Sequence, residues 1–417
     1  MRAEPVKVYE HEALKVDEKN FTSKHLELLS TFLGNKGVED FPYYSLIHKG
    51  VKFKHFVGVI SVGNLQIEVL PKADRHAGED EKGLWESHLL EMLRAVYRLK
   101  VNLPSAADQH VRRSRVLDVV LHQFMDEVER IMHVGLVKAY RRVEDNRTSL
   151  KGRLVLSKHI VKNIVHQERF YVEYTTYDRN HIFNRLLYKA LRVIQDIAAS
   201  NDVILRAKRL AFEFPELEDI VPTEALFNRL CFDRKTEDYR NAMALAKLIL
   251  LNYMPNMTYQ RGNSVVALMF DMNKLWEEYV YIILKRQLAD YTVSAQRYKD
   301  FWQSNTKGRK TVRPDIVIQK DGKCVAVLDT KWKIPYDGKP GDADLKQMFV
   351  YHKYWNTNRT ALLYPGTADS VSVDGHFVKD KEDITECECG MLFLPISDTP
   401  GPNFLETKEL TDYIKTK

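Results

Sequence analysis

The chain has 417 residues, 44% of them hydrophobic and 29% charged, and a formal net charge of +6 at pH 7. Its length allows two or three domains with cores of their own, and its mildly basic character permits nucleic-acid binding without demonstrating it. The four cysteines, Cys231, Cys324, Cys387 and Cys389, form neither a zinc-site pattern nor a disulfide framework, and the apolar run MALAKLILLNYM is too short to span a membrane, so we expect a cytoplasmic protein.

Residues 1–82 are predicted to form a β-rich amino-terminal domain. The segment HFVGVISVGNLQIEVLP has two runs of alternating apolar residues around Gly63-Asn64, which is typical of a two-residue hairpin. Residues 83–262 are expected to be mostly helical, because apolar residues repeat there at intervals of three and four, with a less regular stretch at 139–178 that allows short strands. A polar stretch then marks the entry to a carboxy-terminal domain, 263–417.

Basic residues gather in the middle region. Each one alone is expected to be a solvated helix end or turn, but as a set they indicate an anionic partner, either DNA or an acidic protein surface. The set comprises Arg112, Arg113, Arg115, Arg141, Arg142, Arg147, Lys151 and Arg153.

In the carboxy-terminal region, helix and strand patterns alternate. The segment MFDMNKLWEEYVYIILKRQL has the spacing of a helix with one buried stripe, from which either Glu277 or Glu278 could reach a metal site. After it come a strand in YTVSAQRY, a basic loop, strands in RPDIVIQ and CVAVLDTKW, a helix capped by Asp342 or Asp344, and the buried strands TALLY and MLFLPI. This order predicts a mixed sheet with helices on its faces, and the whole chain is predicted to be an α+β multidomain protein.

Asp315, Asp329 and Lys331 are the candidate catalytic residues. Asp329 and Lys331 are two apart in a strand, so both side chains lie on one face. Apolar residues on both faces of 324–330 predict a covered, central strand, which does not end in two charges without a cause. Two carboxylates suit Mg²⁺, which lowers the pKa of bound water, and the lysine adds positive charge beside a phosphate. The alternative, a solvated strand edge, is typical of an isolated Asp-x-Lys.

The pairing of the two strands decides whether Asp315 and Asp329 meet. A plain two-residue loop at Asp321-Gly322 would place Asp315 opposite Leu328 and leave the carboxylates on opposite faces. A three-residue turn with a left-handed glycine, or a β-bulge, would place Asp315 opposite Asp329 instead. We therefore predict one of these two irregularities.

Gln347 and Tyr351 are four apart, so they share one face of the helix that follows. They are either a rim amide and a half-buried phenol, or functional groups, with Gln347 holding the attacking water or a phosphate oxygen and Tyr351 orienting it. The basic loop before Asp315 is usually just solvated, but beside a phosphodiester site it is a plausible contact for the DNA backbone. The candidate DNA-binding residues are Lys307, Arg309, Lys310 and Arg313.

The carboxylate, lysine and Gln-x-x-x-Tyr pattern resembles the PD-(D/E)xK nuclease superfamily. The strings LWEEYV, RPDIVI, LDTKW, DLKQMFVY and LLYP resemble the McrC family, the nuclease subunits of McrBC-type, modification-dependent (type IV) restriction systems, and GNLQIEVLPK, LKGRL and YTTYDRNHIFNRLLYKAL extend the likeness over nearly the whole chain. The resemblance implies a restriction-endonuclease-like α/β fold for residues 263–417. It implies Asp315, Asp329 and Glu277 as metal ligands, with Thr330 as a further metal contact, and Lys331 as the catalytic lysine.

The chain has no G-x-x-x-x-G-K-[ST] loop, so it is not expected to hydrolyse a nucleotide itself. The resemblance implies a partner that does: a ring-forming, McrB-like AAA+ GTPase that binds the GTP, receives the domain at 1–82 in its channel and is stimulated by it. It also implies Mg²⁺-dependent cleavage of double-stranded DNA in defence against foreign DNA. The alternative is a non-catalytic, DNA-binding regulator that only activates the partner's GTPase, but the intact Asp315, Asp329 and Lys331 favour the nuclease.

Overall fold

The computed structural model describes residues 5–36, 41–63, 65–71, 82–97, 116–198, 200–254, 265–304, 308–333, 335, 338–367, 369–380, 383–397 and 405–415. Two compact units divide the chain. The first combines Met1–Val116 with Met254–Lys417, and the second is Leu117–Tyr253. Among the helices of the described residues, none has both the length and the apolar character needed to cross a membrane.

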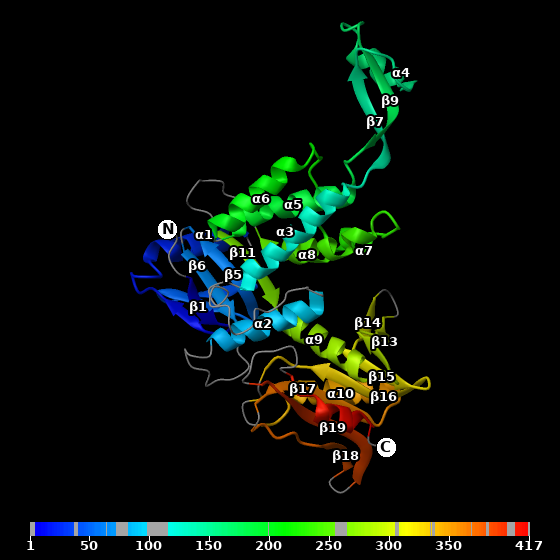
Figure 1. The fold of residues 1–417 in the computed structure, drawn as a ribbon. Helices are drawn as coiled ribbons and strands as arrows, with labels where there is room; N and C mark the ends of the chain where they lie inside the picture. The colour runs from blue at the N-terminus through cyan, green and yellow to red at the C-terminus, as the bar shows by residue number, and fades with distance from the viewer. Residues whose placement is uncertain are drawn as a thin grey trace. The chain divides into compact units, whose positions relative to one another are not determined.

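The amino-terminal part of the first unit is built on a sheet in which β5 lies between β6 and β11 (Figure 1). Strand β1 pairs with β6 in parallel, and β5 pairs antiparallel with both neighbours. The predicted hairpin is confirmed: Val62 pairs with Leu65, and Gly63 has a positive φ of 58°, while Asn64 lies outside the described residues. The strands are β1 (Val6–Tyr9), β5 (Phe56–Val62), β6 (Leu65–Leu70) and β11 (Val265–Asp271).

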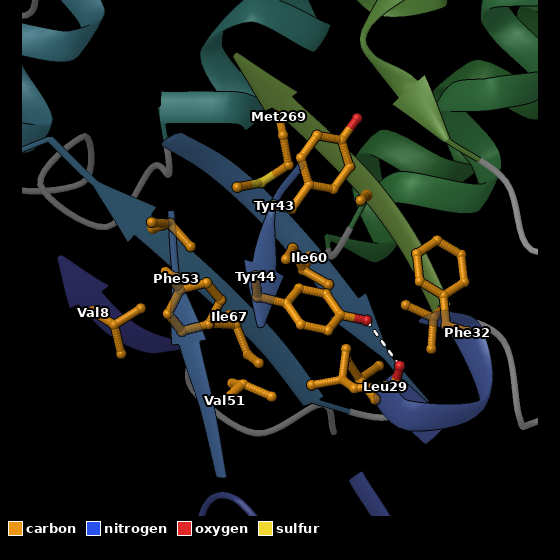
Figure 2. Close-up of a cluster of buried hydrophobic side chains, with 14 of the residues drawn as sticks. Val8, Leu29, Phe32, Tyr43, Tyr44, Val51, Phe53, Ile60, Ile67 and Met269 are labelled. Carbon is orange, nitrogen blue, oxygen red and sulfur yellow. Dashed lines mark hydrogen bonds between the residues drawn. The ribbon is translucent and has the colours of Figure 1, made fainter. Parts of the chain in front are cut away.

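A helix that we did not predict, α1 (Ser23–Lys36), covers this sheet together with a small three-stranded sheet. Figure 2 shows the resulting core, in which the Tyr44 hydroxyl donates to the carbonyl of Leu29 at 2.9 Å. Leu29 and Phe32, three apart on the helix, are both fully buried there. The small sheet consists of β2 (Ala13–Lys15), β3 (Tyr44–Ile47) and β4 (Gly50–Phe53).

Strand β11 joins two regions that we expected to be separate domains. It lies after the predicted boundary at residue 263, yet it pairs with β5 along its whole length, from Val265 opposite Val62 to Asp271 opposite Phe56. Asp271 then caps α9 (Met272–Gln287), accepting from the backbone amide of Asn273. The helix that carries Glu277 therefore starts at the end of a strand of the amino-terminal sheet.

The carboxy-terminal part contains the predicted mixed sheet, in the order β12-β15-β16-β17-β19-β18. Strand β16 is central, with β15 antiparallel on one side and β17 parallel on the other. Helix α10 packs against β16, β17 and β19, as Figure 1 shows. The elements are β12 (Thr292–Ala295), β15 (Ile316–Lys320), β16 (Lys323–Thr330), α10 (Asp342–Trp355), β17 (Arg359–Gly366), β18 (His376–Asp380), β19 (Asp383–Pro395) and α11 (Lys408–Lys415).

Two further elements frame this sheet. Helix α2 (Lys82–Tyr97) contacts both α9 and β6. Strands β13 (Lys299–Gln303) and β14 (Arg309–Val312) form a separate two-stranded ribbon. The predicted cap of α10 is wrong: the N-cap residue is Gly341, without a side-chain cap, because Asp344 is instead engaged by two lysines.

The second unit is mostly helical, as predicted, and α5 packs against α6 and α8. The less regular stretch at 139–178 contains two strands of nine residues, which pair as a long antiparallel ribbon with α4 inserted between them (Figure 1). The elements are α3 (Val116–Val134), β7 (Ala139–Arg147), β8 (Arg153–Leu154), α4 (Leu156–Lys162), β9 (Phe170–Asp178), α5 (Ile182–Ile197), α6 (Asn201–Glu213), α7 (Glu224–Asn228), the 3-10 helix Glu237–Tyr239 and α8 (Arg240–Leu251), with the two-residue strand β10 (Tyr253–Met254) next in the chain.

Buried Asn184 ties the base of this ribbon to the helices. Its amide donates to the carbonyls of Val137 and Arg179, which flank β7 and β9, and it accepts from the Tyr239 hydroxyl at 2.8 Å. An uncharged side chain with all three bonds satisfied can be buried at little cost.

Several of the basic residues predicted to meet an anionic partner are engaged inside this unit. Arg141 pairs with Asp178 and Glu218, both at 2.8 Å, and Arg153 pairs with Glu173. Arg147 and Lys151 lie over the ring of Tyr174. Arg112, Arg113 and Arg115 lie outside the described residues. Much of the positive charge is therefore used in contacts within this unit.

Candidate active site

A β-bulge brings Asp315 and Asp329 together. Strands β15 and β16 are joined by the two-residue loop Asp321-Gly322, in which both residues have positive φ, and Lys320 pairs with Lys323. The register shifts between Ile318 and Gln319, so that Ile316 faces Leu328. The residue before Ile316 is consequently next to Asp329. Of the two predicted irregularities, the bulge is confirmed and the three-residue turn is wrong.

Asp315 is held in place by Thr330. The backbone amide and the hydroxyl of Thr330 both donate to Asp315 Oδ2, at 2.7 and 2.9 Å. The side chain of Thr330 thus positions the first carboxylate. Its role as a metal contact stays a prediction.

Asp329 is a buried carboxylate at the end of a central strand, only 2% exposed. Burial raises its pKa to about 6, and the charge of Asp315 adds to the increase, although Lys331 opposes it. Lys331 Nζ lies 2.6 Å from Asp329 Oδ2, and Gln347 donates to Oδ1 at 3.3 Å. The two-residue spacing thus places the carboxylate and the ammonium side by side, as predicted.

Lys331 lies between two carboxylates, because Asp344 of α10 is 3.4 Å from its Nζ. Burial tends to lower the pKa of Lys331, but the charges of Asp329 and Asp344 outweigh it and raise the pKa. The side chain therefore keeps its proton at neutral pH. Lys333 contacts the other oxygen of Asp344 at 2.8 Å, so this aspartate anchors both lysines. Asp344 was considered from the sequence only as a helix cap.

Of the two glutamates on α9, Glu277 faces the site and Glu278 is exposed. Burial raises the pKa of Glu277 to about 7, and the nearby charge of Asp315 raises it further, against a hydrogen bond from Gln296. That bond, from Gln296 Nε2 to Glu277 Oε1, is 2.8 Å long. Gln296 was not predicted, since a lone glutamine in a strand pattern carries no chemical signal.

Gln347 and Tyr351 do share one face of α10, and they are linked to the carboxylates. Gln347 Nε2 donates to the Tyr351 hydroxyl at 2.6 Å as well as to Asp329. The Tyr351 hydroxyl in turn donates to the carbonyl of Arg313 at 2.9 Å. This chain of contacts fixes the segment just before Asp315 to the helix.

Of the candidate DNA-binding residues, Arg309 and Lys310 lie on β14, and Arg313 is exposed two residues before Asp315. Arg309 makes an exposed ion pair with Asp300 at 3.2 Å. Lys307 lies outside the described residues.

The donor set suits a hard cation in its chemistry, since Asp315, Asp329 and Glu277 offer only oxygen ligands. Asp315 raises the pKa of both other carboxylates, which is the repulsion that a cation between them would relieve. In the described part of the chain, however, no group of three or more His, Cys, Asp or Glu side chains lies close enough together to hold a metal ion. Lys331 instead compensates the charge of Asp329.

Trp332, next to Lys331, was also missed. Its indole donates to Glu10 Oε1 at 2.6 Å, and its ring packs against those of Trp85 and Trp276. The segment just after β16 is thereby fixed to a residue 322 positions earlier. No local pattern in the sequence indicates such a contact.

Residues 51–365 match the family model of the McrBC 5-methylcytosine restriction system component. The chain belongs to this family. The resemblance found in the sequence motifs is thus confirmed for the McrBC family, although no curated protein sequence matches the chain.

Solved structures with a similar fold come from Thermococcus gammatolerans. One is described as a refined half-complex from a tetradecameric assembly of McrB AAA+ hexamers with bound McrC; it has 19% sequence identity, covers 94% of both chains and gives a TM-score of 0.59. The other is the cryo-EM structure of the McrBC complex, with 21% identity, coverage of 69% of this chain and 89% of that one, and a TM-score of 0.44. At 19% identity, the first likeness establishes the fold alone.

Proposed function

We propose that this McrBC family member is the McrC-type nuclease subunit, a Mg²⁺-dependent DNA endonuclease that also stimulates the GTPase of an AAA+, McrB-like partner. Its carboxy-terminal sheet and flanking helices are then a PD-(D/E)xK nuclease domain. The observation that carries the proposal is the convergence of Asp315, Asp329 and Lys331 at the end of a central, buried strand. Two carboxylates this close, one of them buried, cost folding stability, and groups perturbed in this way cluster at functional sites.

In this proposal, Asp315, Asp329 and Glu277 hold the Mg²⁺, which when bound supplies positive charge at the phosphate and acidifies water. Lys331 remains protonated because both neighbouring aspartates raise its pKa, so it stabilises negative charge that develops on the phosphate and does not act as a base. Gln347 orients Asp329 through its amide. Thr330 fixes Asp315 through two bonds to Oδ2, which leaves Oδ1 for the ion.

The test uses the complex rather than the isolated chain. The protein is co-purified with the product of the neighbouring gene, and plasmid cleavage is measured on methylated and unmethylated DNA with Mg²⁺ and GTP. We expect cleavage that needs both Mg²⁺ and GTP. A complex that hydrolyses GTP but never cuts DNA, over a range of methylation states, would favour the non-catalytic regulator.

The absence of a nucleotide-binding loop gives a further prediction. The isolated chain should bind no GTP, but adding it should raise the partner's GTP turnover several-fold. Equilibrium binding of labelled GTP and phosphate release with and without this chain measure the two parts. Tight GTP binding by this chain alone would contradict the assignment of the GTP to the partner.

The partner contact is supported by exposed apolar side chains around α4, from Leu150 before β8 to the loop after α4. Large apolar residues there are more than half exposed, and α4 has no buried residue. Apolar clusters of this kind usually mark protein contacts. Residues 1–82, which we expected to engage the partner, bury their large apolar side chains in their own core, apart from Leu46 among the described residues. The exposed set is Leu150, Leu156, Ile160, Val161, Ile164 and Val165.

Charging this surface should therefore uncouple the partner. In Val161→Asp/Val165→Asp, the stimulation of GTP turnover should fall about tenfold or more, because two charges would have to be buried in an apolar contact. The fold should be unaffected, since the two side chains are 77% and 80% exposed. Phe212→Asp, at a 92% exposed site on α6, is the matched control. Full stimulation by the double variant would remove α4 from the partner contact.

A further inference from the structure

The β13–β14 ribbon leaves the body of the protein at the carboxylate site and returns to it. Gln296 lies three residues before β13. Its side-chain Nε2 donates to Glu277 Oε1, and its backbone N–H donates to the carbonyl of Asp315, at 2.8 Å each. Asp315 itself follows β14 by three residues. Both ends of the ribbon are therefore anchored on the candidate catalytic residues.

The surface of this ribbon combines exposed rings with positive charge. Tyr298 is 71%, Phe301 48% and Trp302 55% exposed. Segments 299–303 and 309–313 hold the cations Lys299, Arg309, Lys310 and Arg313 against the single acid Asp300. Exposed aromatic rings in such a short ribbon are not needed for a core, and they are costly to leave in water.

The ribbon is held against α10 on one side. Lys299 donates to the carbonyl of Tyr354 at 2.6 Å, and the ring of Phe301 packs against that of Tyr354 at 5.7 Å. The register shift between Asp300 and Trp302 makes Phe301 the bulged residue. By contrast, Trp302 packs on no other ring among the described residues. Phe301 thus fixes the ribbon to α10, and Trp302 is available to a ligand.

A groove of about 590 Å³ runs between the ribbon and α10. Phe301 and Arg313 line it from the ribbon side, and Lys346, Gln347 and Tyr351 line it from the helix. Gln347 also contacts Asp329, so the groove shares a residue with the carboxylate site. Its volume is in the range of pockets that enclose a small ligand, roughly 300 to 1,000 Å³.

We propose that the β13–β14 ribbon holds an unpaired DNA strand beside the scissile phosphate, with its cations on the phosphates and Trp302 stacked on an unpaired base. This inference rests on the proposed nuclease function and adds the substrate's form to it. A rigid duplex hides the faces of its bases, whereas an unpaired strand offers them to exposed aromatic rings, and interleaved cations and rings are typical of single-strand binding. The excess of cations over acids favours an anionic partner over a basic or neutral one, and the exposed rings favour a nucleic acid with accessible bases among the anionic partners.

Trp302 also provides a direct readout. The other four tryptophans, Trp85, Trp276, Trp332 and Trp355, are at most 7% exposed, so quenching by a stacked base should come from Trp302. The full-length chain, with EDTA and at one fixed salt concentration, is titrated with oligodeoxythymidylate and with the same strand in a duplex. We expect strong quenching by the single strand and weak quenching by the duplex.

Three variants complete the experiment. Trp302→Ala should weaken binding of the single strand about fivefold or more, the size expected for one lost base stack. Trp302→Phe should keep the affinity while removing the quenching, and Phe212→Ala, which removes an exposed ring on α6, should change neither. Equal binding of single strand and duplex, or wild-type affinity in Trp302→Ala, would overturn the proposal. A change in Trp302 fluorescence on adding the partner protein, with none on adding DNA, would overturn it as well.

Failure here can be told apart from failure of the proposed function. If the complex cuts DNA but Trp302→Ala binds oligonucleotides normally, the nuclease stands and the ribbon proposal falls. If Trp302 is quenched as expected and no cleavage occurs under any condition, binding of an unpaired strand by the ribbon stands, while the nuclease function and the scissile phosphate beside the ribbon fall.

Discussion

Asp329→Ala is expected to abolish DNA cleavage while leaving stimulation of the partner's GTPase intact. The carboxylate is one of three oxygen donors proposed to hold Mg²⁺, and without it the charge on the remaining donors is too low for tight placement of the ion. Its described contacts, Lys331 and Gln347, are local to the sheet and α10. The surface proposed for the partner lies in the other unit of the chain.

Trp332 links the candidate site to the rest of its unit. This residue follows Lys331 and bonds to Glu10, so β16 is not independent of the amino-terminal part of the chain. Plasmid cleavage and phosphate release should therefore be measured on one preparation. Loss of both activities in a normally folded Asp329→Ala would show that the proposed nuclease site and the contact with the partner GTPase are coupled, and the expected separation of the two activities would be wrong.

Removing the charge of Asp329, as in Asp329→Asn, should not destabilise the metal-free protein. The folded-state pKa of Asp329 is raised to about 6 from 3.8, so the carboxylate is less favourable in the folded chain than in the unfolded one once it ionises. Its penalty is absent below about pH 4, grows as pH rises toward 6 and is complete above that. The Tm of Asp329→Asn relative to the parent should rise over this window in EDTA. Lys331 keeps Asp344 as its partner.

The sequence was most informative where a functional requirement restricted local geometry. Two carboxylates that must share one face of a hairpin with an even loop require an irregular register, and the bulge between Ile318 and Gln319 supplies it. The spacing of the helix alone left Glu277 and Glu278 open. The family resemblance selected Glu277, which is half-buried, whereas Glu278 is exposed.

Contacts between distant segments could not be predicted in this way. The Glu10–Trp332 bond joins residues 322 apart, and Asp344 reaches Lys331 only because α10 packs across β16. Strand β11 was assigned to the carboxy-terminal region because it precedes α9 in sequence, while its hydrogen bonds belong to β5. Helix α1 was missed because the strand signals around it dominated the composition of the segment. Pairing and packing choices of this kind depend on the whole chain.

Lys331→Ala is expected to retain DNA and Mg²⁺ binding while losing about 2 to 4 kcal/mol of transition-state stabilisation, roughly a 30- to 900-fold lower cleavage rate. The ammonium group is fixed before the substrate arrives, 2.6 Å from Asp329 and 3.4 Å from Asp344, so its charge needs no reorganisation during the reaction. Such a charge acts mainly on the transition state, where the phosphate gains negative charge.

The matched control is Lys333→Ala. Lys333 contacts Asp344 at 2.8 Å, as Lys331 does at 3.4 Å, but its side chain is 55% exposed and it makes no ion pair with Asp329 among the described residues. Removing it takes away one lysine from the same aspartate without touching the proposed metal ligands, so cleavage should stay within about threefold of the parent, as is usual for an exposed ion pair. Single-turnover cleavage of both variants, with DNA binding measured in EDTA, tests the pair. A near-normal rate in Lys331→Ala would mean that the lysine only balances the charge of Asp329. Removing a charge that stabilises the transition state must lower the rate.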